Sequence, residues 1–565
     1  MKRYIALLLC LVMIFTMLAS CKKDEYDVND YKDDAETEES ATVKNDKDDT
    51  EKDEGKTDKT PDSDKTTAPS KKDESDKKDD TDPDTPVSND TTDNSTTTMD
   101  KFDKNDKNVV TENTVVPEVE TTPPAEDADL SEIVFDTSDG EIDSAAQNSH
   151  NDVKYETEVP SNIEELVLSK SDFDETKLTL PVMKIDTLDK TAITSKNTYK
   201  NATISVTNSS KCSLSNYGVE IRGRGNSTWS FFNKKAYKLR FPVAQDLFGM
   251  GAGRKWVLLA NALDETMLRN YLTLTYAKSI GCKFATDCQF VSLILNGEYQ
   301  GVYLLCEQVQ EGENRVDVNT SKTGEVDTGY FLEGINNRSA VDYRTFRVND
   351  VDGQHLGTGN FQFIVKSPNK LECTGEQLAF IHGIVADANE AIFKKDWAKI
   401  QETCDVESFV NLFLVNEISL NNDMGYSFYL YREKGGKLSI GPVWDYDQAM
   451  GSSSHGGSTF KGWYAGSKLQ WFTTLIEIPE FKELVKQKYL ATKASADSLV
   501  TRIDSTITKY RYDFAMDNAL WANYGVKRWR ITPELIKLKT YKEHVTYLKT
   551  WITNRMRWME SDLGI

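Results

Sequence analysis

The chain has 565 residues, which is enough for two or three domains and excludes a single small module. Its formal net charge of −23 lies almost entirely in residues 21–150, which contain 16 lysines against 41 acidic residues. Residues 151–565 are electrically balanced. A nucleic-acid-binding protein needs a basic face on a domain, so this balance argues against that class of function and against a nucleic-acid partner.

The N-terminus has the pattern of an export signal. Lys2 and Arg3 precede an apolar run over residues 4–18, and small residues lead into Cys21. The run is shorter than the roughly 20 residues that span a bilayer. We therefore expect residues 1–20 to be a lipoprotein signal peptide and Cys21 to be lipidated, which predicts an extracytoplasmic protein anchored to a bacterial membrane by lipid alone. The alternative is an uncleaved signal anchor.

Residues 21–170 are predicted to be a disordered linker. Asp, Lys, Thr, Ser, Asn and Pro dominate this segment, and so few apolar residues cannot offset the entropy lost on folding. A flexible coil of this length would reach roughly 65 Å, and charge repulsion would extend it. We interpret the linker as a spacer between the membrane and a folded domain over residues 175–565.

Six cysteines follow Cys21, and none of them lies in a Cys-x-x-Cys pair. With five histidines in the whole chain, no spacing predicts a zinc site. Cys282 and Cys288 could form a disulfide in an exported protein, or they could remain as buried thiols.

The folded domain is predicted to be α+β, with a strand-rich part over about residues 175–400 and a helical part over about 401–565. Alternation and β-branched content predict strands at 180–187, 202–207, 217–222, 236–241, 289–295, 301–305, 329–333 and 361–366. Helical periodicity predicts helices at 264–280, with Asp264 as the cap, at 380–393 and 406–418, and through the last hundred residues.

A glycine-bearing turn at 223–228 is followed by a strictly alternating strand. In residues 236–241, Lys238 and Arg240 share one face and the apolar residues share the other. Glycines allow backbone amides to approach phosphate oxygens, and a cation on the next strand can neutralise them. The pattern is therefore that of a phosphate-binding turn, although a simple tight turn has the same composition.

Two aspartates alternate with aromatic residues near position 445. Asp445 and Asp447 would project from one face of an extended segment, while Trp444 and Tyr446 would face the other way. Carboxylates suit Mg²⁺, which binds substrate phosphates through one or two of them. Asp423 could be a general base on a loop after a helix. The alternative is a pair of capped turns with solvated aspartates.

Several stretches together resemble the CotH family, a spore-coat protein kinase family with an atypical protein-kinase-like fold. The resemblance runs over roughly residues 178–560, and its motifs keep the family's order. The stretches are Arg222–Trp229, Lys234–Leu239, Lys255–Asn261, Leu268–Asn270, Asn296–Tyr303 and Trp444–Asp447.

The resemblance implies a two-lobe fold, with a strand-rich N-lobe and a helical C-lobe, and the cofactors ATP and Mg²⁺. Lys238 would be the cation that contacts the phosphates, with Lys235 and Arg240 as alternatives. The backbone from Glu307 to Val309 would form a hinge that binds adenine. The turn that would cover the phosphates comprises Gly223, Arg224, Gly225, Asn226 and Ser227.

The same resemblance assigns the carboxylates. Asp423 would be the catalytic aspartate, Asp445 would bind the metal, and Asp447 would assist it, as phosphoryl transfer requires positioning and charge stabilisation. The expected function is a surface-anchored kinase that transfers the γ-phosphoryl of ATP to a Ser/Thr hydroxyl of an unknown protein substrate.

Two other functions remain open. ATP is scarce outside the membrane, which favours a kinase-shaped binding or assembly module of the cell surface with little catalysis. A glycoside hydrolase that uses Asp423 with Asp445 has support only from the carboxylates themselves.

Overall fold

The computed structural model describes residues 153–335, 343–357, 361–421, 424–425, 428–454, 459–465 and 469–565. The predicted signal peptide, Cys21, most of the predicted linker and Asp423 lie outside these ranges. Within them, no helix is both long enough and apolar enough to cross a membrane.

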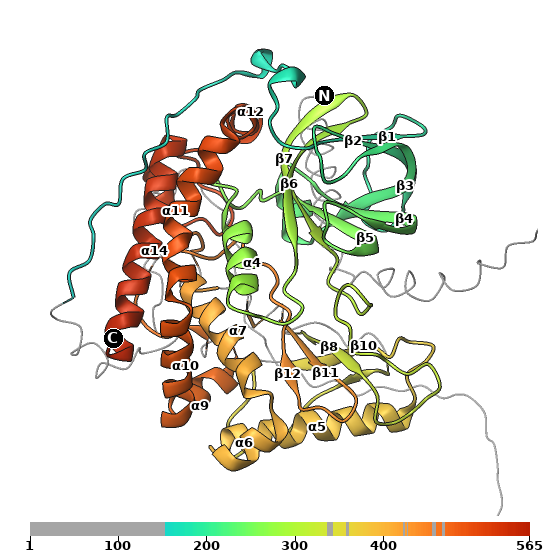
Figure 1. Ribbon diagram of the computed structural model, residues 1–565, viewed down its shortest axis with the longest axis vertical. Coiled ribbons are helices and arrows are strands. Elements are labelled where there is room, and N and C mark those ends of the chain that lie inside the picture. Colours follow the sequence, from blue (N-terminus) through green and yellow to red (C-terminus); the bar gives the residue numbers. More distant parts are fainter. Residues whose placement is uncertain are drawn as a thin grey trace, which may run out of the picture. The chain divides into compact units, whose positions relative to one another are not determined.

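Seven strands form a closed barrel in the order β1-β2-β3-β4-β5-β7-β6 (Figure 1). Neighbours are antiparallel except where β1 pairs in parallel with β6 and closes the barrel. The Asn296–Gly297 turn joins β6 to β7. The strands are β1 Val182–Thr187, β2 Lys200–Thr207, β3 Leu214–Arg224, β4 Ala236–Asp246, β5 Ala252–Leu259, β6 Cys288–Leu295 and β7 Glu298–Glu307.

Side chains on β4 alternate between the inside of the barrel and its outward face, as the sequence predicted. Tyr237, Leu239 and Phe241 pack inside the barrel, whereas Lys238 lies on the outward face. On β5 the outward residue Val257 belongs instead to the larger core shared with the helices. The barrel wall is therefore buried on both sides where β5 passes the helices, because the outward face of that strand is also apolar.

The helix predicted at 264–280 is shorter at its start. α4 spans Arg269–Ser279, because the Asp264 carboxylate accepts hydrogen bonds from the backbone N–H groups of both Thr266 and Arg269. These bonds fold residues 264–268 into a turn that precedes the helix. α4 packs on the barrel through Tyr271, whose ring lies 4.9 Å from that of Phe290.

A second sheet has the strand order β12-β11-β8-β10-β9. Two of its strands, β11 and β12, come from the part predicted to be helical, because the largely buried run Phe428–Arg432 pairs with the distant strand β8. α5 covers this sheet, with the Phe380 ring 6.0 Å from that of Tyr330 (Figure 1). The strands are β8 Tyr330–Ile335, β9 Thr345–Phe346, β10 Gln362–Ser367, β11 Phe428–Arg432 and β12 Ser439–Ile440.

Most of the other helices come from the C-terminal part of the chain. α7 and α14 are joined by a fully buried ion pair between Glu417 and Arg555, 2.6 Å apart. Besides α4, the helices are α3 Ser227–Phe231, α5 Gly375–Phe393, α6 Trp397–Thr403, α7 Val406–Ser419, α9 Gln470–Ile476, α10 Pro479–Ala491, α11 Lys493–Lys509, α12 Arg511–Trp521, α13 Pro533–Lys537 and α14 Tyr541–Leu563, with 3₁₀ turns η3 Lys170–Asp172 and η4 Glu175–Lys177.

Residues 153–170, placed by the sequence in the linker, lie along α14. The Glu156 N–H donates to Asn554 at 2.7 Å and the Val159 N–H to Thr550 at 2.8 Å. Polar side chains on one face of α14 thus satisfy backbone N–H groups of this segment.

The cysteines within the described ranges are free thiols, so Cys282 and Cys288 form no disulfide in this structure. Cys288 lies instead directly across from Cys306 on the neighbouring strand.

Candidate functional site

The glycine turn between β3 and β4 is shaped by close packing. A Cβ atom on Gly223 would lie 2.3 Å from the Trp229 ring, and Gly225 has a φ of +91°, which favours glycine. The Gly223 N–H donates to the Ser195 carbonyl at 2.9 Å. The fold therefore requires both glycines, and it already uses one of the amides that a phosphate could have bound.

Lys238 lies where a cavity meets the outward face of the barrel. This cavity, about 450 Å³ in volume, is lined by Lys238, Lys255 of β5, and Val309 after β7. Lys238 is only 4% exposed. The structure thus brings the predicted phosphate cation and the predicted hinge to one space, which we call the barrel cavity.

The two alternatives to Lys238 have other partners. Lys235 donates to the Trp229 carbonyl at 2.5 Å and lies over that ring. Arg240 also lines the barrel cavity, but its guanidinium pairs with Glu220 at 2.6 Å and stacks 4.3 Å from the centre of the Tyr199 ring. Both side chains therefore already have partners in or beside the barrel.

At the predicted hinge, the Glu307 side chain is held by contacts with neighbouring residues. Its carboxylate accepts from Arg315 at 2.6 Å and from the Asp287 N–H at 2.7 Å, and burial raises the pKa of Glu307 to about 7. Arg315 in turn lies 4.7 Å from the centre of the Trp256 ring. Glu307 thus holds the segment that includes Val309 against the barrel, and its side chain is not among the residues lining the cavity.

The Asp445 segment shows the predicted alternation of burial. Trp444 and Tyr446 are buried, and Asp445 and Asp447 are half-buried. Asp445 has a φ of +70°, which is uncommon outside glycine and costs free energy that the surroundings must supply. This dihedral angle breaks the extended geometry, so the two carboxylates do not follow the regular repeat of a strand that the sequence suggested.

Side chains from the start of α4 hold this segment. The Tyr446 N–H donates to Asn270 Oδ1 at 2.8 Å, and Asn270 donates to Asn261 Oδ1 at 3.0 Å. Sequence reasoning assigned no role to either asparagine, although both lie in stretches that carry the family resemblance. Their amides replace the sheet partner that an isolated extended segment lacks.

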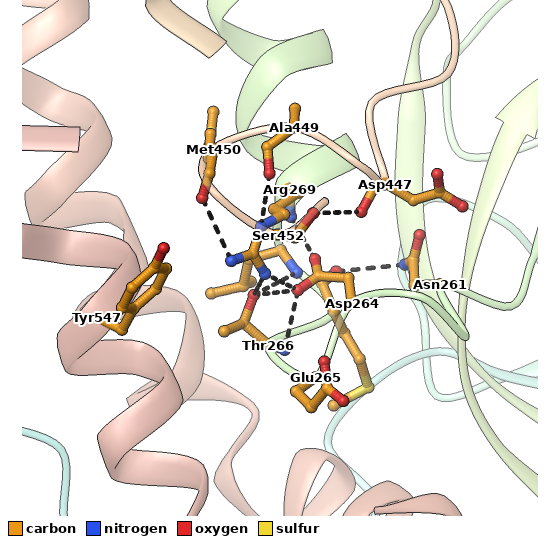
Figure 2. Close-up of polar contacts among 12 residues, drawn as sticks. Asn261, Asp264, Glu265, Thr266, Arg269, Asp447, Ala449, Met450, Ser452 and Tyr547 are labelled. Carbon is orange, nitrogen blue, oxygen red and sulfur yellow. Dashed lines mark hydrogen bonds and ion pairs between the residues drawn. The ribbon is translucent and has the colours of Figure 1, made fainter. Parts of the chain in front are cut away.

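A buried arginine fixes the turn after Asp447 (Figure 2). Arg269 pairs with Asp264, both side chains being 1% exposed, and donates to the Ala449 carbonyl at 2.9 Å. The Ser452 hydroxyl donates to the Asp447 carbonyl at 3.2 Å. In this view the Asp447 carboxylate points away from Arg269. The arginine therefore organises the backbone and leaves the Asp447 carboxylate directed elsewhere.

The glycine turn reaches the carboxylate segment through Arg224. Its guanidinium lies 5.6 Å from the centre of the Trp444 ring, one residue before Asp445. Residues more than 200 positions apart thus meet at one place. Asp423, the predicted catalytic aspartate, lies outside the described residues.

The chemistry of the donor set decides which metal could bind. No group of three or more His, Cys, Asp or Glu side chains in the described part of the chain could hold a metal ion. Asp445 and Asp447 supply hard oxygens without sulfur or imidazole. They therefore fit a hard divalent cation that takes its other ligands from water and a phosphate-bearing molecule, and they do not form a complete protein cage.

The fold and this site define a mixed α+β protein in which a cavity with lysines on its walls lies beside a strand barrel. Comparison with known families gives a match to the family model described as CotH kinase protein over residues 221–559. That match covers more than half of the chain, so the protein belongs to the CotH kinase protein family, which confirms the resemblance. It is kinase-like, and the cofactors that this membership implies are ATP and a divalent metal ion. No curated protein matches the chain.

Proposed function

We propose that this protein transfers the γ-phosphoryl group of ATP to a serine or threonine hydroxyl of another protein, at the bacterial cell surface to which Cys21 tethers it. The observation that carries the proposal is the contact of Arg224 with Trp444, which joins the glycine turn to the carboxylate segment. Lys238 and Val309 line one cavity, which supports a nucleotide position there.

The residues assigned to ATP, Mg²⁺ and the substrate hydroxyl have distinct roles in this reaction. Arg224 and Lys238 bind the triphosphate, the backbone from Glu307 to Val309 binds adenine, and Asp445 and Asp447 hold Mg²⁺. The bound cation supplies neutralisation of phosphate charge. Asp423 orients the substrate hydroxyl and accepts its proton while the oxygen attacks the γ-phosphorus. The bond from that phosphorus to the β–γ bridging oxygen breaks, and ADP leaves.

Removal of the Asp445 or the Asp423 carboxylate should strongly reduce phosphoryl transfer. We expect Asp445→Asn and Asp423→Asn in the full chain to lower labelled phosphate transfer from [γ-³²P]ATP at least about 100-fold, because charge stabilisation and proton acceptance each contribute that much or more. Asp497→Asn, at an exposed aspartate paired with Lys493, is the matched control and should keep full activity.

Two results would contradict this proposal in different ways. Phosphoryl transfer that survives both substitutions would contradict the assignment of the site to these residues but not the kinase activity. A parent chain that shows no Mg²⁺-dependent thermal shift with ATP would favour the kinase-shaped binding module, since a ligand at about 100 times its Kd should add about 2.7 kcal/mol.

A further inference from the structure

A second cavity, of about 470 Å³, has no part in the proposed phosphoryl transfer. It lies among the end of α3, the residues between β5 and α4, the end of α12, and the loop that follows α12. It shares no lining residue with the barrel cavity. We call it the aromatic cavity, after Phe231, Phe232, Trp521, Tyr524 and Trp529, which line it.

A buried ion pair forms one wall of the aromatic cavity. Lys234 lies 2.5 Å from Asp517, and both side chains are at most 6% exposed. Asp517 also accepts from the Val302 N–H at 2.7 Å. A Cβ atom on Gly301 would lie 2.2 Å from the Asp517 carboxylate, so only glycine allows this approach. This part of the cavity is therefore rigid and its charges are already compensated.

Another wall carries polar atoms without partners. Glu265 pairs with Arg528 and its side chain is 3% exposed. Within the described residues, Glu265 Oε2, Arg528 Nε and the Tyr524 hydroxyl are buried and have no hydrogen-bond partner. Buried polar atoms left unpaired are costly, so this wall is suited to a ligand that supplies partners. An acceptor close to a donor matches the N–H and C=O groups of a peptide.

The mouth of the cavity adds an aromatic surface and positive charge. Phe231 is 60% exposed, and its ring lies 5.2 Å from that of Trp529. Such a pair suits an aromatic side chain of a ligand. Lys170 and Lys527 are exposed lining residues, so acidic neighbours of that side chain would be attracted.

The chain that lines the aromatic cavity continues to the residues that follow the carboxylate segment. The chain leaves the cavity at Trp529 and pairs at once with the residues after Asp447: the Ser454 N–H donates to the Arg530 carbonyl at 2.9 Å, and the Thr532 N–H donates to the Ser452 carbonyl at 3.2 Å. A polypeptide bound at the cavity would thus lie beside the backbone that follows the proposed metal ligands.

We propose that the aromatic cavity docks the protein substrate, through a segment with one aromatic residue among acidic neighbours. This inference rests on the proposed function for the identity of the ligand as an acceptor protein. A glycan could also stack on aromatic rings, but the exposed lysines and the buried donor and acceptor atoms favour an acidic peptide.

Binding of a defined peptide to the full chain tests the docking proposal without nucleotide. The probe is a fluorescein-labelled octapeptide with one phenylalanine and one serine among aspartates and glutamates, and its control has alanine in place of phenylalanine. Fluorescence anisotropy should show binding of the probe and at least about tenfold weaker binding of its control, as expected for an aromatic anchor.

Variants locate the binding. Phe231→Ala should weaken binding of the probe at least about tenfold, whereas Leu371→Ala, at another exposed apolar residue (75% exposed), should leave it unchanged. Glu265→Gln should also weaken binding. The melting temperature of Glu265→Gln shows whether this variant still folds. If it does not fold, Phe231→Ala tests the proposal by itself, because Phe231 is exposed.

Absence of probe binding, or equal binding by Phe231→Ala and the parent, would overturn the docking proposal. So would binding of a chito-oligosaccharide that Phe231→Ala abolishes while the probe does not bind, since that result assigns the cavity to a glycan. The ATP thermal shift, measured separately, should be the same for Phe231→Ala and the parent. A chain that binds the probe but not ATP would contradict phosphoryl transfer and leave peptide docking intact.

Discussion

The burial of Glu307 makes the stability of the fold depend on pH. Glu307 lies at the end of β7, is 8% exposed, and receives Arg315 and the Asp287 N–H. Burial disfavours its charged form more than these contacts favour it, so its pKa rises to about 7. The residue therefore binds a proton in the folded chain over a pH range in which the unfolded chain has lost it.

This shift predicts a stability that falls as pH rises. Since the folded pKa lies above the unfolded value, the contribution is complete below about pH 4.5 and is lost as pH rises through about 7, by up to about 3 kcal/mol. We expect Glu307→Gln to flatten the fall in unfolding free energy between pH 4.5 and 7, measured by urea denaturation. Glu298→Gln, an exposed position on the same strand, should keep the parent slope, and a parent-like slope in Glu307→Gln would exclude Glu307 as its source.

The β3–β4 hairpin is the element that carries the glycine turn. Residues 227–231 form a short helix there, and the Trp229 side chain folds back over Gly223. Arg222 donates to the Gly223 carbonyl at 3.3 Å. The turn is thus held by packing across its own glycine, and the position of Arg224 beside Trp444 depends on that packing.

An added methyl group should affect stability differently at the two glycines of β3, Gly223 and Gly218. Gly223→Ala forces the Trp229 ring to move and should cost about 1–3 kcal/mol, because a tightly packed site cannot absorb a methyl group. Gly218→Ala has nothing within 4 Å of the new Cβ atom and should be neutral or slightly stabilising. Thermal melting of both variants checks this prediction, and equal melting temperatures would show that the turn adapts freely.

At the scale of the whole molecule, buried ion pairs join parts that are distant in the chain. Arg269 connects the start of α4 with Asp264 and with the carbonyls after Asp447. Arg555 connects α14 with Glu417 of α7 and with the Gly462 carbonyl at 2.7 Å. Each arginine satisfies several acceptors at once, so its loss would leave a carboxylate and carbonyls unpaired.

Arg269→Ala should destabilise the fold far more than an equal change of charge at the surface. Removal of one partner leaves Asp264 buried without its counter-charge, at a cost of about 3–5 kcal/mol. Lys395→Ala breaks an exposed pair with Glu477 and should cost at most about 1 kcal/mol. Urea denaturation of both variants measures the difference, and similar losses would contradict a structural role for Arg269.

Particular elements show where prediction from sequence succeeded. Residues 236–241 alternate, and their apolar members lie inside the barrel as predicted. Other predictions missed strands. Neither β5 nor β11 was predicted, because their apolar residues serve two buried faces or a distant partner strand.

The candidate site was likewise predicted only in part. Alternation around Asp445 was correct for burial, but its positive φ could not be predicted, because α4 and the turn after Asp447 impose it. The roles of Asn270 and Arg269 likewise depend on contacts across about 180 residues. The sites assigned to Lys238, Asp445 and Asp447 remain predictions.

Local patterns were sufficient for the alternation of most strands, for the period of most helices, for the family motifs and for the residue types that suit phosphate and a hard cation, because short stretches of neighbouring residues set these properties. The meeting of Arg224 with Trp444, the shared cavity of Lys238 and Val309, and the unpartnered atoms of the aromatic cavity required the folded chain. These features arise from contacts between residues far apart in sequence, and no local period records which distant partners a side chain will meet.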